Sequence, residues 1–195
     1  MEGFDYSGYD DPQRLKDIIH WTTLALRLPP VPLNVVFPTE DACRERLVSV
    51  RWPNGVMCPS CGESSISELS KRQLFRCRSC RVQFSATSGT LLHNTHISTM
   101  VWFLAAEKLI RTHAVAWCAD HISGRFLAKK VGRSYSSAVR MKEILIRDVG
   151  PSGPGLVRES ICTVHFSLPD DIAPGSARHA AWLQLSLVEQ RKPAW

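Results

Sequence analysis

The sequence predicts an α+β fold, with one short β module between helical segments. Three observations favour this fold: paired cysteines in a segment with Pro and Gly at its turns, apolar residues at helical spacing on both sides of it, and a Gly/Pro-rich break at residues 150–155. They divide the 195 residues into four parts. These parts are an N-terminal helix with a Pro-rich linker (1–34), the β module (35–97), a helical region (98–149), and a linker with a tail of weak periodicity (150–195).

The N-terminal part predicts one helix over residues 11–27. Asp11 can cap its first turn, and Pro12 suits the first helical position, where no backbone donor is needed. Its inward face follows helical spacing: Leu15, Ile18, Ile19, Thr22 and Leu26. The Leu-Pro-Pro-Val-Pro run that follows ends the helix and predicts an extended linker. A second short helix is expected from Thr39, as its cap, to about Val48.

Residues 52–86 predict a small β module built around a metal ion. Four cysteines form two C-x-x-C pairs with fifteen residues between them: Cys58, Cys61, Cys77 and Cys80. Zinc takes four soft ligands in a tetrahedron, and each pair can supply two of them from one tight turn. Gly62 permits the backbone conformation that such a turn needs. Bound Zn²⁺ then replaces the hydrophobic core that so short a module lacks, so we predict a zinc ribbon with a structural ion.

Other interpretations of the cysteines stay open at this point. Iron accepts the same ligand set, and a redox dithiol or a disulfide pair would use the same residue type. Three cysteines have no partner in the sequence pattern and are interpreted as small apolar residues: Cys43, Cys118 and Cys162. His93 and His96 follow the ribbon closely enough to add ligands in principle, but a closed four-sulfur site has no vacancy.

Arginines alternate with apolar residues and cysteines along the second half of the ribbon. The arginines are Arg72, Arg76, Arg78 and Arg81, and the residues between them include Phe75, Cys77, Cys80 and Val82. Alternate residues of a strand point to opposite faces, so one face would turn toward the metal with Phe75 and Phe84, and the other would present guanidinium groups outward. Guanidinium groups bind phosphate bidentately, and we interpret these arginines as DNA contacts. The alternative is a charged edge that prevents aggregation.

A helix capped by Ser98 is expected over residues 100–110, and two more are expected in residues 122–147. In the first of this pair an apolar face precedes Gly132, which can end the helix in the left-handed conformation; the face consists of Leu127, Ala128 and Val131. Ser134 can cap the second helix, in which three residues would face inward: Ala138, Met141 and Leu145.

This pair has the sequence pattern of a helix-turn-helix. In that motif the second helix enters the major groove, and its N-terminal residues reach base edges. The candidate base contacts are Tyr135, Ser136, Ser137 and Arg140. The candidate phosphate contacts are Lys129, Lys130 and Arg133. The alternative is a helical hairpin that only packs.

Charge is distributed unevenly along the chain. The formal net charge is +6, made up of −4 over residues 1–45, +10 over residues 46–150 and 0 over residues 151–195. Positive charge gathered on the segment that holds the cysteine pairs is what a polyanion partner such as DNA would require. A solvated surface is the alternative.

The residues resemble the transposase zinc-ribbon domain, which opens a class of bacterial insertion-sequence transposases. The resemblance rests on the runs Phe-Pro-Thr-Glu-Asp-Ala from Phe37, Arg-Trp-Pro-Asn-Gly-Val-Met-Cys-Pro-Ser-Cys from Arg51, Phe-Arg-Cys-Arg-Ser-Cys-Arg-Val-Gln-Phe-Ser from Phe75, and Thr-Ser-Gly-Thr from Thr87. The helix with Trp102 and Phe103 follows in the expected order, and the similarity extends over about residues 35–147. One departure is a run that looks inserted at residues 114–120.

The resemblance implies a chain that recognises double-stranded DNA at the ends of its element. In the family a catalytic domain follows, with three acidic residues that hold two metal ions. Four acidic residues lie beyond position 150, and the tail is too short for such a fold: Glu159, Asp170, Asp171 and Glu189. We therefore expect a non-catalytic, truncated transposase rather than an enzyme, with a tail that is out-of-frame sequence.

Two alternatives to this function stay open: a zinc-ribbon module that binds proteins, and an accessory subunit that works with a full-length transposase. In the tail a strand near residues 161–166 and a helix near residues 176–190 are expected. The acidic start of the chain does not resemble a signal peptide, and no apolar stretch reaches the length of a membrane span, so the sequence predicts a cytoplasmic protein.

Overall fold

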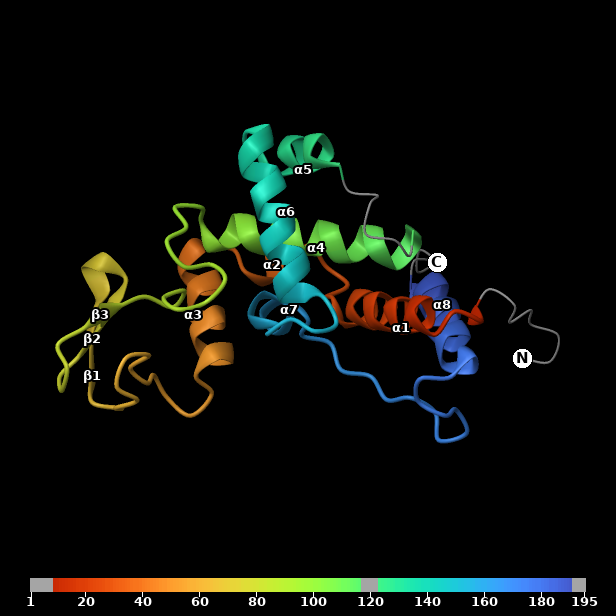
Figure 1. Cartoon of the computed structure of the whole chain (residues 1–195), viewed down its shortest axis with the longest axis horizontal. Coiled ribbons are helices and arrows are strands. Elements are labelled where there is room, and N and C mark those ends of the chain that lie inside the picture. Colours follow the sequence, from red (N-terminus) through yellow and green to blue (C-terminus); the bar gives the residue numbers. More distant parts are fainter. Residues whose placement is uncertain (1–8, 117–122, 191–195) are drawn as a thin grey trace.

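The computed structural model describes residues 9–116 and 123–190 (Figure 1). It combines helices with one small antiparallel sheet, as the sequence predicts. The helices are α1 (Pro12–Arg27), α2 (Leu33–Val36), α3 (Glu40–Arg51), α4 (Thr99–Ala116), α5 (Gly124–Val131), α6 (Tyr135–Val149), α7 (Leu156–Ile161) and α8 (Ala177–Gln190). The strands are β1 (Ile66–Leu69), β2 (Leu74–Cys77) and β3 (Gln83–Phe84), with a short 3₁₀ turn at Ser70–Arg72.

Side-chain caps set the start of several helices, at the residues where the sequence predicts them. The Asp11 carboxylate accepts from the Gln13 N–H, and the Thr39 hydroxyl accepts from the Ala42 N–H at 3.1 Å. The helix that Thr39 caps continues to Arg51, beyond the expected end at Val48. The short α2, which follows the Pro-rich run, has no counterpart in the sequence prediction.

The main hydrophobic core surrounds α4. This helix packs against α1, α2, α3, α5, α6 and α7, and it buries large side chains such as Trp102, Phe103 and Leu109. Figure 1 shows α4 lying lengthwise through the molecule, with α6 crossing it. We call α1, α2 and α4–α8 the helical body. None of the described helices combines the length and the hydropathy that crossing a lipid bilayer requires.

The tail after α6 belongs to the helical body. Helix α7 packs against α3, α4 and α6, and α8 packs against α1. Five tail residues are buried in the main core: Val157, Ile161, Cys162, Leu183 and Leu187. The tail thus shares one core with the segment that precedes it.

The prediction of a strand near residues 161–166 is wrong. Ile161 ends α7, and the extended residues after it pair with no strand among the described residues. Helix α7 forms here because the Asp148 carboxylate accepts from the Leu156 and Val157 N–H groups at its start. A single backbone bond, from the Val164 N–H to the Arg27 carbonyl, holds the extended part. The expected second tail helix is present as α8.

The sheet lies at one end of the molecule, apart from the helical body (Figure 1). Its order is β1-β2-β3, and both pairs are antiparallel. The register places Phe75 opposite Phe84, so that both rings turn to the same face. Together with Cys58 and Cys77 these rings form a second, separate core. We call this sheet, with the cysteine loops, the ribbon.

Helix α3 joins the two cores because it packs against both of them. Cys43 and Leu47 are buried in the main core, one turn apart. On the face toward the ribbon, Asp41 accepts from the Gln73 side chain at 2.9 Å, and the Arg44 guanidinium lies 5.6 Å from the centre of the Phe75 ring. Val48 packs against both cores. The ribbon is therefore held at a defined orientation by one helix.

Candidate metal centre and nucleic-acid interface

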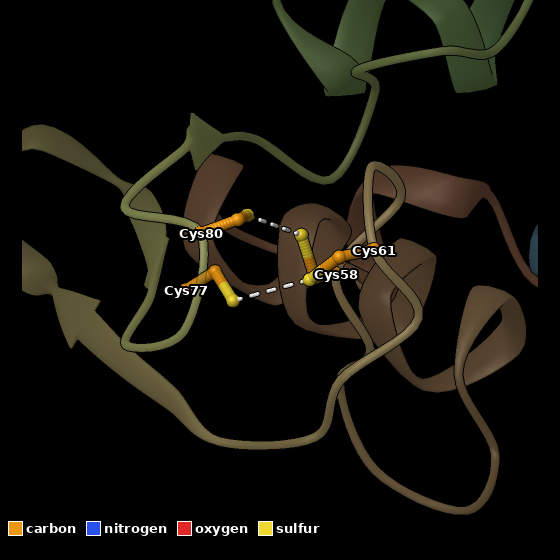
Figure 2. A group of neighbouring side chains, drawn as sticks. All are labelled: Cys58, Cys61, Cys77 and Cys80. Atoms are coloured by element: carbon orange, nitrogen blue, oxygen red, sulfur yellow. Dashed lines mark hydrogen bonds between the residues drawn. The ribbon is translucent and has the colours of Figure 1, made fainter.

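The four cysteines of the ribbon gather in one cluster. Figure 2 shows their side chains pointing toward one another from two loops. All four sulfurs lie within 4.8 Å of one another, and two Sγ–Sγ pairs, Cys58 with Cys80 and Cys61 with Cys77, are each 3.6 Å apart. Ligands at a Zn–S distance of about 2.3 Å in a tetrahedron have sulfurs about 3.8 Å apart. The donor set and its spacing thus fit a structural Zn²⁺.

The sulfur distances also exclude the disulfide interpretation for this structure. A disulfide bond is about 2.05 Å long, whereas the closest pairs are separated by 3.6 Å. All four cysteines are free. The four-sulfur cluster is complete without His93, whose Nδ1 accepts from the Gly89 N–H at 3.2 Å.

Two equivalent loops present the cysteines. In the first, the Gly62 N–H donates to the Cys58 carbonyl at 2.9 Å, and the Cys58 N–H donates to the Glu63 carbonyl. In the second, the Cys77 N–H donates to the Val82 carbonyl at 3.0 Å. The fourth residue after the leading cysteine has a positive φ in both loops: 77° at Gly62 and 64° at Arg81. Glycine adopts this conformation without steric cost, and arginine does not.

The loops also stabilise the thiolate form that a metal requires. A hydrogen bond from the Cys80 backbone, opposed by burial, lowers the pKa of the Cys77 thiol to about 6. For Cys58, burial opposes ionisation, but hydrogen bonds from the Cys61 and Ser60 backbone lower the pKa. For Cys61, a backbone hydrogen bond at Glu63 lowers the pKa. Burial and hydrogen bonds with the side chains of Cys80, Cys77 and Cys58 outweigh it and raise the pKa to about 12. Because these thiols compete for charge, a cation is needed to hold all four as thiolates.

Aromatic rings complete the small core beneath the metal centre. The rings of Phe75 and Phe84 lie 5.6 Å apart, and Trp52 meets each of them edge-on at 5.9 Å. Arg51 covers Trp52, with its guanidinium carbon 4.3 Å from the centre of the indole ring. The loop between the ribbon and α4 is held by the same guanidinium, which donates to the Ala86 carbonyl at 2.7 Å.

The arginines of the ribbon lie on its surface. Arg76 is exposed on β2 between Phe75 and Cys77, which are both buried, so the predicted alternation holds along this strand. Arg76 pairs with Gln83 of the neighbouring strand β3, and Arg72, Arg76 and Gln83 line one shallow groove. Arg78 and Arg81 are exposed on the second cysteine loop. The expectation that Val82 turns inward is wrong: it is 38% exposed, because the strand ends at Cys77 and the alternation ends with it.

The two helices after α4 have the expected local features. Gly132 follows α5 with a φ of 64°, and the Ser134 hydroxyl accepts from the Ser137 N–H at the start of α6. All six residues predicted to face inward are buried in or packed against the main core: Leu127, Ala128, Val131, Ala138, Met141 and Leu145. The candidate DNA contacts of the pair lie outside this face. Lys129, Lys130, Arg133, Tyr135, Ser136 and Arg140 are exposed, and Ser137 is half-buried.

The remaining cysteines act as small apolar residues where the structure describes them. Cys43 is fully buried, and burial raises the pKa of its thiol to about 11. Cys162 is buried as well, and burial raises its pKa to about 12. Cys118 lies outside the described residues. So does most of the run that looks inserted in the sequence, of which Ala114–Ala116 belong to the end of α4.

Two residues that position the ribbon were missed by the sequence analysis. Glu40, in the first turn of α3, accepts from the Thr99 N–H at 2.5 Å and from the Met100 N–H at 3.0 Å, and so caps α4. Arg51 ties the end of α3 to the loop after β3, through bonds to Ala86 and Ser88. Their partners lie 35 to 60 positions away, so no local pattern reveals either role.

Comparison with known proteins finds two similarities, and one of them covers the ribbon. Residues 38–83 match the transposase zinc-ribbon domain. A protein of Halobacterium salinarum, described as an uncharacterized protein in transposable element ISH50, is 28% identical over 123 residues. The match takes in 62% of this chain and 39% of that protein, so the chain spans well under two thirds of its relative's length. No solved structure matches the chain.

The matched segment begins just before the cap of α3 and ends in β3. It therefore contains the four cysteines, the ribbon arginines and the helix that joins the ribbon to the body. The chain is accordingly transposase-related, with a structural zinc site in its ribbon.

Proposed function

We propose that this chain binds double-stranded DNA at the ends of an insertion sequence, as the recognition part of a transposase does, and that zinc holds one half of its DNA interface in shape. The observation that carries the proposal is a set of unpaired surface cations on both halves. Nine exposed arginines have no ion pair among the described residues, and six of the nine are candidate DNA contacts: Arg72, Arg76, Arg78, Arg81, Arg133 and Arg140. The other three are Arg14, Arg125 and Arg147.

Other arginines of the chain are engaged in structural ion pairs. Arg27 and Arg158 both contact Glu159, and Arg111 pairs with Glu107 one turn earlier on α4. The contrast separates cations that hold the fold from cations left for a partner. A partner that supplies phosphate groups at close spacing would satisfy several free guanidinium groups at once.

The α5–α6 pair would supply base contacts as a helix-turn-helix. A tight turn at Gly132 joins the two helices, and the N-terminal turns of α6 carry Tyr135, Ser136, Ser137 and Arg140 on or near the surface. In this motif those positions reach base edges in the major groove. The neighbouring hydroxyl groups can bind either member of a pair, and the five donors of Arg140 can contact a base edge and an adjoining phosphate. Lys129, Lys130 and Arg133 would contact the flanking phosphates.

The proposed activity is binding without DNA cleavage. Two-metal cleavage needs free carboxylates that converge on one point. Three of the five described carboxylates after residue 147 have structural partners: Asp148 accepts from the start of α7, Glu159 pairs with Arg27, and Asp171 pairs with Arg178. Among the described residues, the four cysteines are the only group of His, Cys, Asp or Glu side chains close enough to hold a metal ion. In this reading a catalytic centre, where the element uses one, is formed by other residues or another chain.

The test is a gel-shift titration of zinc-loaded, full-length protein with duplex DNA from the ends of its own element, with and without a chelator. We expect binding whose log affinity falls steeply with log salt, and a large loss when zinc is removed. The matched pair of variants is Arg76→Ala, which removes a free ribbon cation, and Arg178→Ala, which removes an exposed cation already paired with Asp171. Absence of binding at low salt by the zinc-loaded protein would exclude the proposal.

A protein-binding role for the ribbon is the second candidate. The observation that favours it is apolar exposure next to the cysteine loops, where Met57 is 48% and Val82 is 38% exposed. An apolar partner surface would cover these side chains, whereas DNA phosphates would not. The double variant Met57→Ser/Val82→Ser separates the two roles, because it should leave DNA affinity unchanged and abolish binding to a full-length transposase.

A further inference from the structure

A cavity of about 260 Å³ lies between the loop that leads from the ribbon to α4 and the first turns of α6. Trp102 and Met141, both buried, contribute to its floor. Its polar lining comes from both elements: His93, Asn94, Thr95, His96, Ser137 and Arg140. None of the residues that line it is acidic. We call it the loop–α6 pocket.

Hydrogen bonds within the loop fix which polar groups remain to bind a ligand. The Gly89 N–H donates to Nδ1 of His93 at 3.2 Å, so in the neutral ring the proton resides on Nε2. The Thr95 hydroxyl oxygen accepts twice, from the Trp102 indole at 3.3 Å and from the Ile97 N–H at 3.2 Å, which leaves its proton to donate. Both residues therefore offer donors.

The α6 side of the pocket offers donors as well. Ser137 accepts from the Ser134 hydroxyl at 2.9 Å, and this leaves the Ser137 proton to donate. Arg140 carries only donors and is one of the guanidinium groups without an ion pair among the described residues. A pocket whose polar groups offer several donors and include no carboxylate selects an anion with several acceptor oxygens.

The loop is shaped in advance for this role. Asn94 has a φ of 57°, a left-handed conformation that asparagine tolerates better than most residues. The Thr95–Trp102 bond anchors the next residue to the buried floor. The loop connects β3 to α4, and so it lies between the ribbon and α6 (Figure 1). DNA that reached from the ribbon arginines to the N-terminal turns of α6 would pass this loop.

We propose that the loop–α6 pocket binds a backbone phosphate of the DNA, with His93, Thr95, Ser137 and Arg140 as its donors and His96 at its rim. This inference rests on the proposed DNA-binding function and adds to it a third contact element, between the ribbon and the helix pair. The occupant is a phosphodiester of duplex DNA. A free phosphate ion has the same chemistry, and the experiment separates the two sources.

The experiment measures the binding of zinc-loaded, full-length protein to a fluorescent 30-base-pair duplex at low salt. The test variant is His93→Asn/His96→Ala. Asparagine places an oxygen near the position of Nδ1, so it keeps the acceptor for the Gly89 N–H and removes the Nε2 donor. The control is His165→Ala, which removes an exposed histidine from the segment between α7 and α8. Zinc content and circular dichroism verify that each variant is folded.

We expect the double variant to bind about tenfold more weakly, as the loss of hydrogen bonds to a charged group implies, while His165→Ala binds as the wild type does. Wild-type affinity in the double variant would overturn the pocket and leave the proposed function intact. Failure of the wild-type protein itself to bind would overturn the proposed function together with this inference.

A second measurement identifies the source of the phosphate. The ring signals of His93 and His96 are followed by nuclear magnetic resonance during titration with the duplex, and separately with inorganic phosphate at constant ionic strength. Shifts with the duplex alone support a DNA contact. Saturable shifts with submillimolar inorganic phosphate, at a site whose loss leaves DNA affinity unchanged, would overturn it in favour of a free-anion site.

Discussion

The ribbon and the helical body differ in what fills their cores. The buried part of the ribbon core consists of Cys58, Phe75, Cys77 and Phe84, and two of these four residues belong to the metal centre. The body core buries more than twenty residues, with Trp102, Phe103 and Leu109 at its centre on α4. Removing the metal would thus leave the ribbon with one aromatic cluster around Trp52, whereas the body would keep its core.

This contrast shows that one chain can divide its stability between two sources. The body depends on apolar burial, and its free energy of unfolding responds to the loss of side-chain volume. Ribbon stability depends on a bound ion, and therefore on chelation and thiol chemistry. Helix α3 contributes to both cores through adjoining faces, and Val48 packs against both, so the two sources meet at one element.

The largest expected effect comes from breaking the metal centre. Cys77→Ser removes a fully buried ligand and should abolish zinc binding, with a loss of about 10 kcal/mol or more of metal-linked ribbon stability. Hydrogen exchange should then lose its protection in β1–β3 and keep it in α4. Cys43→Ala, a buried cysteine outside the cluster, serves as the control and should retain one zinc per chain. Loss of protection throughout α4 would show that the two cores are not separable.

The second prediction concerns the main core, which we expect to be destabilised by a substitution that leaves the metal centre intact. Leu145 is fully buried on α6, and Leu145→Ala should lower the free energy of unfolding of the body by about 2–5 kcal/mol through lost burial and an added cavity. Zinc stoichiometry should stay at one, as measured by atomic absorption alongside denaturant unfolding. A variant that loses zinc in parallel with helix content would contradict the division into two cores.

A third change should move stability and DNA affinity in opposite directions. Arg81 holds a φ of 64° in the second cysteine loop, where the first loop has Gly62. Arg81→Gly should relieve about 1 kcal/mol of backbone strain and tighten zinc retention against a chelator. The same variant removes a free cation, and the proposed function predicts weaker DNA binding with a shallower salt dependence. Arg81→Ala is the control, since it removes the charge and keeps most of the strain.

The smallest expected effect concerns the contact between α1 and the tail. Although burial opposes it, the Arg27 guanidinium at 2.8 Å lowers the pKa of Glu159, so the pair stabilises the fold above the unfolded-state pKa and this contribution is lost as the pH falls through the folded-state value. Glu159 is 40% exposed, and Glu159→Gln should therefore cost about 0.5–1 kcal/mol at pH 7. The difference from wild type should vanish in strong acid, as followed by thermal unfolding across pH. A difference that persisted there would indicate a cause other than charge.

Local patterns predicted the parts of the molecule whose causes are local. The caps at Asp11, Thr39 and Ser134 and the turn at Gly132 depend on residues within a few positions, and the structure has each of them. The cysteine cluster was predictable because each half of the ligand set is contained in one tight turn.

Features that depend on distant partners were not predictable in this way. The strand expected near residues 161–166 is absent from the described residues because the extended segment after α7 lies against α1, where the Val164 N–H donates to the Arg27 carbonyl, and not beside another strand. Val82 could not be placed by alternation, since the point where β2 ends is set by the cysteine loop. The packing of α8 on α1 joins segments more than 150 positions apart, and no periodicity within either helix encodes it.

Because helix α3 packs against both cores, it also sets the distance between the ribbon and the helical body. With Leu47 fixed in one core and Val48 shared with the other, the ribbon cannot swing freely about a flexible joint. A chain with a loose tether would accept target sites at many separations. In this chain the ribbon and the helical body are held at a fixed spacing. If both bind one duplex, the protein therefore sets the distance between the two DNA segments that they contact. Base pairs inserted between these segments should be tolerated only in whole turns of the double helix, and only where the DNA can bend to restore the original span.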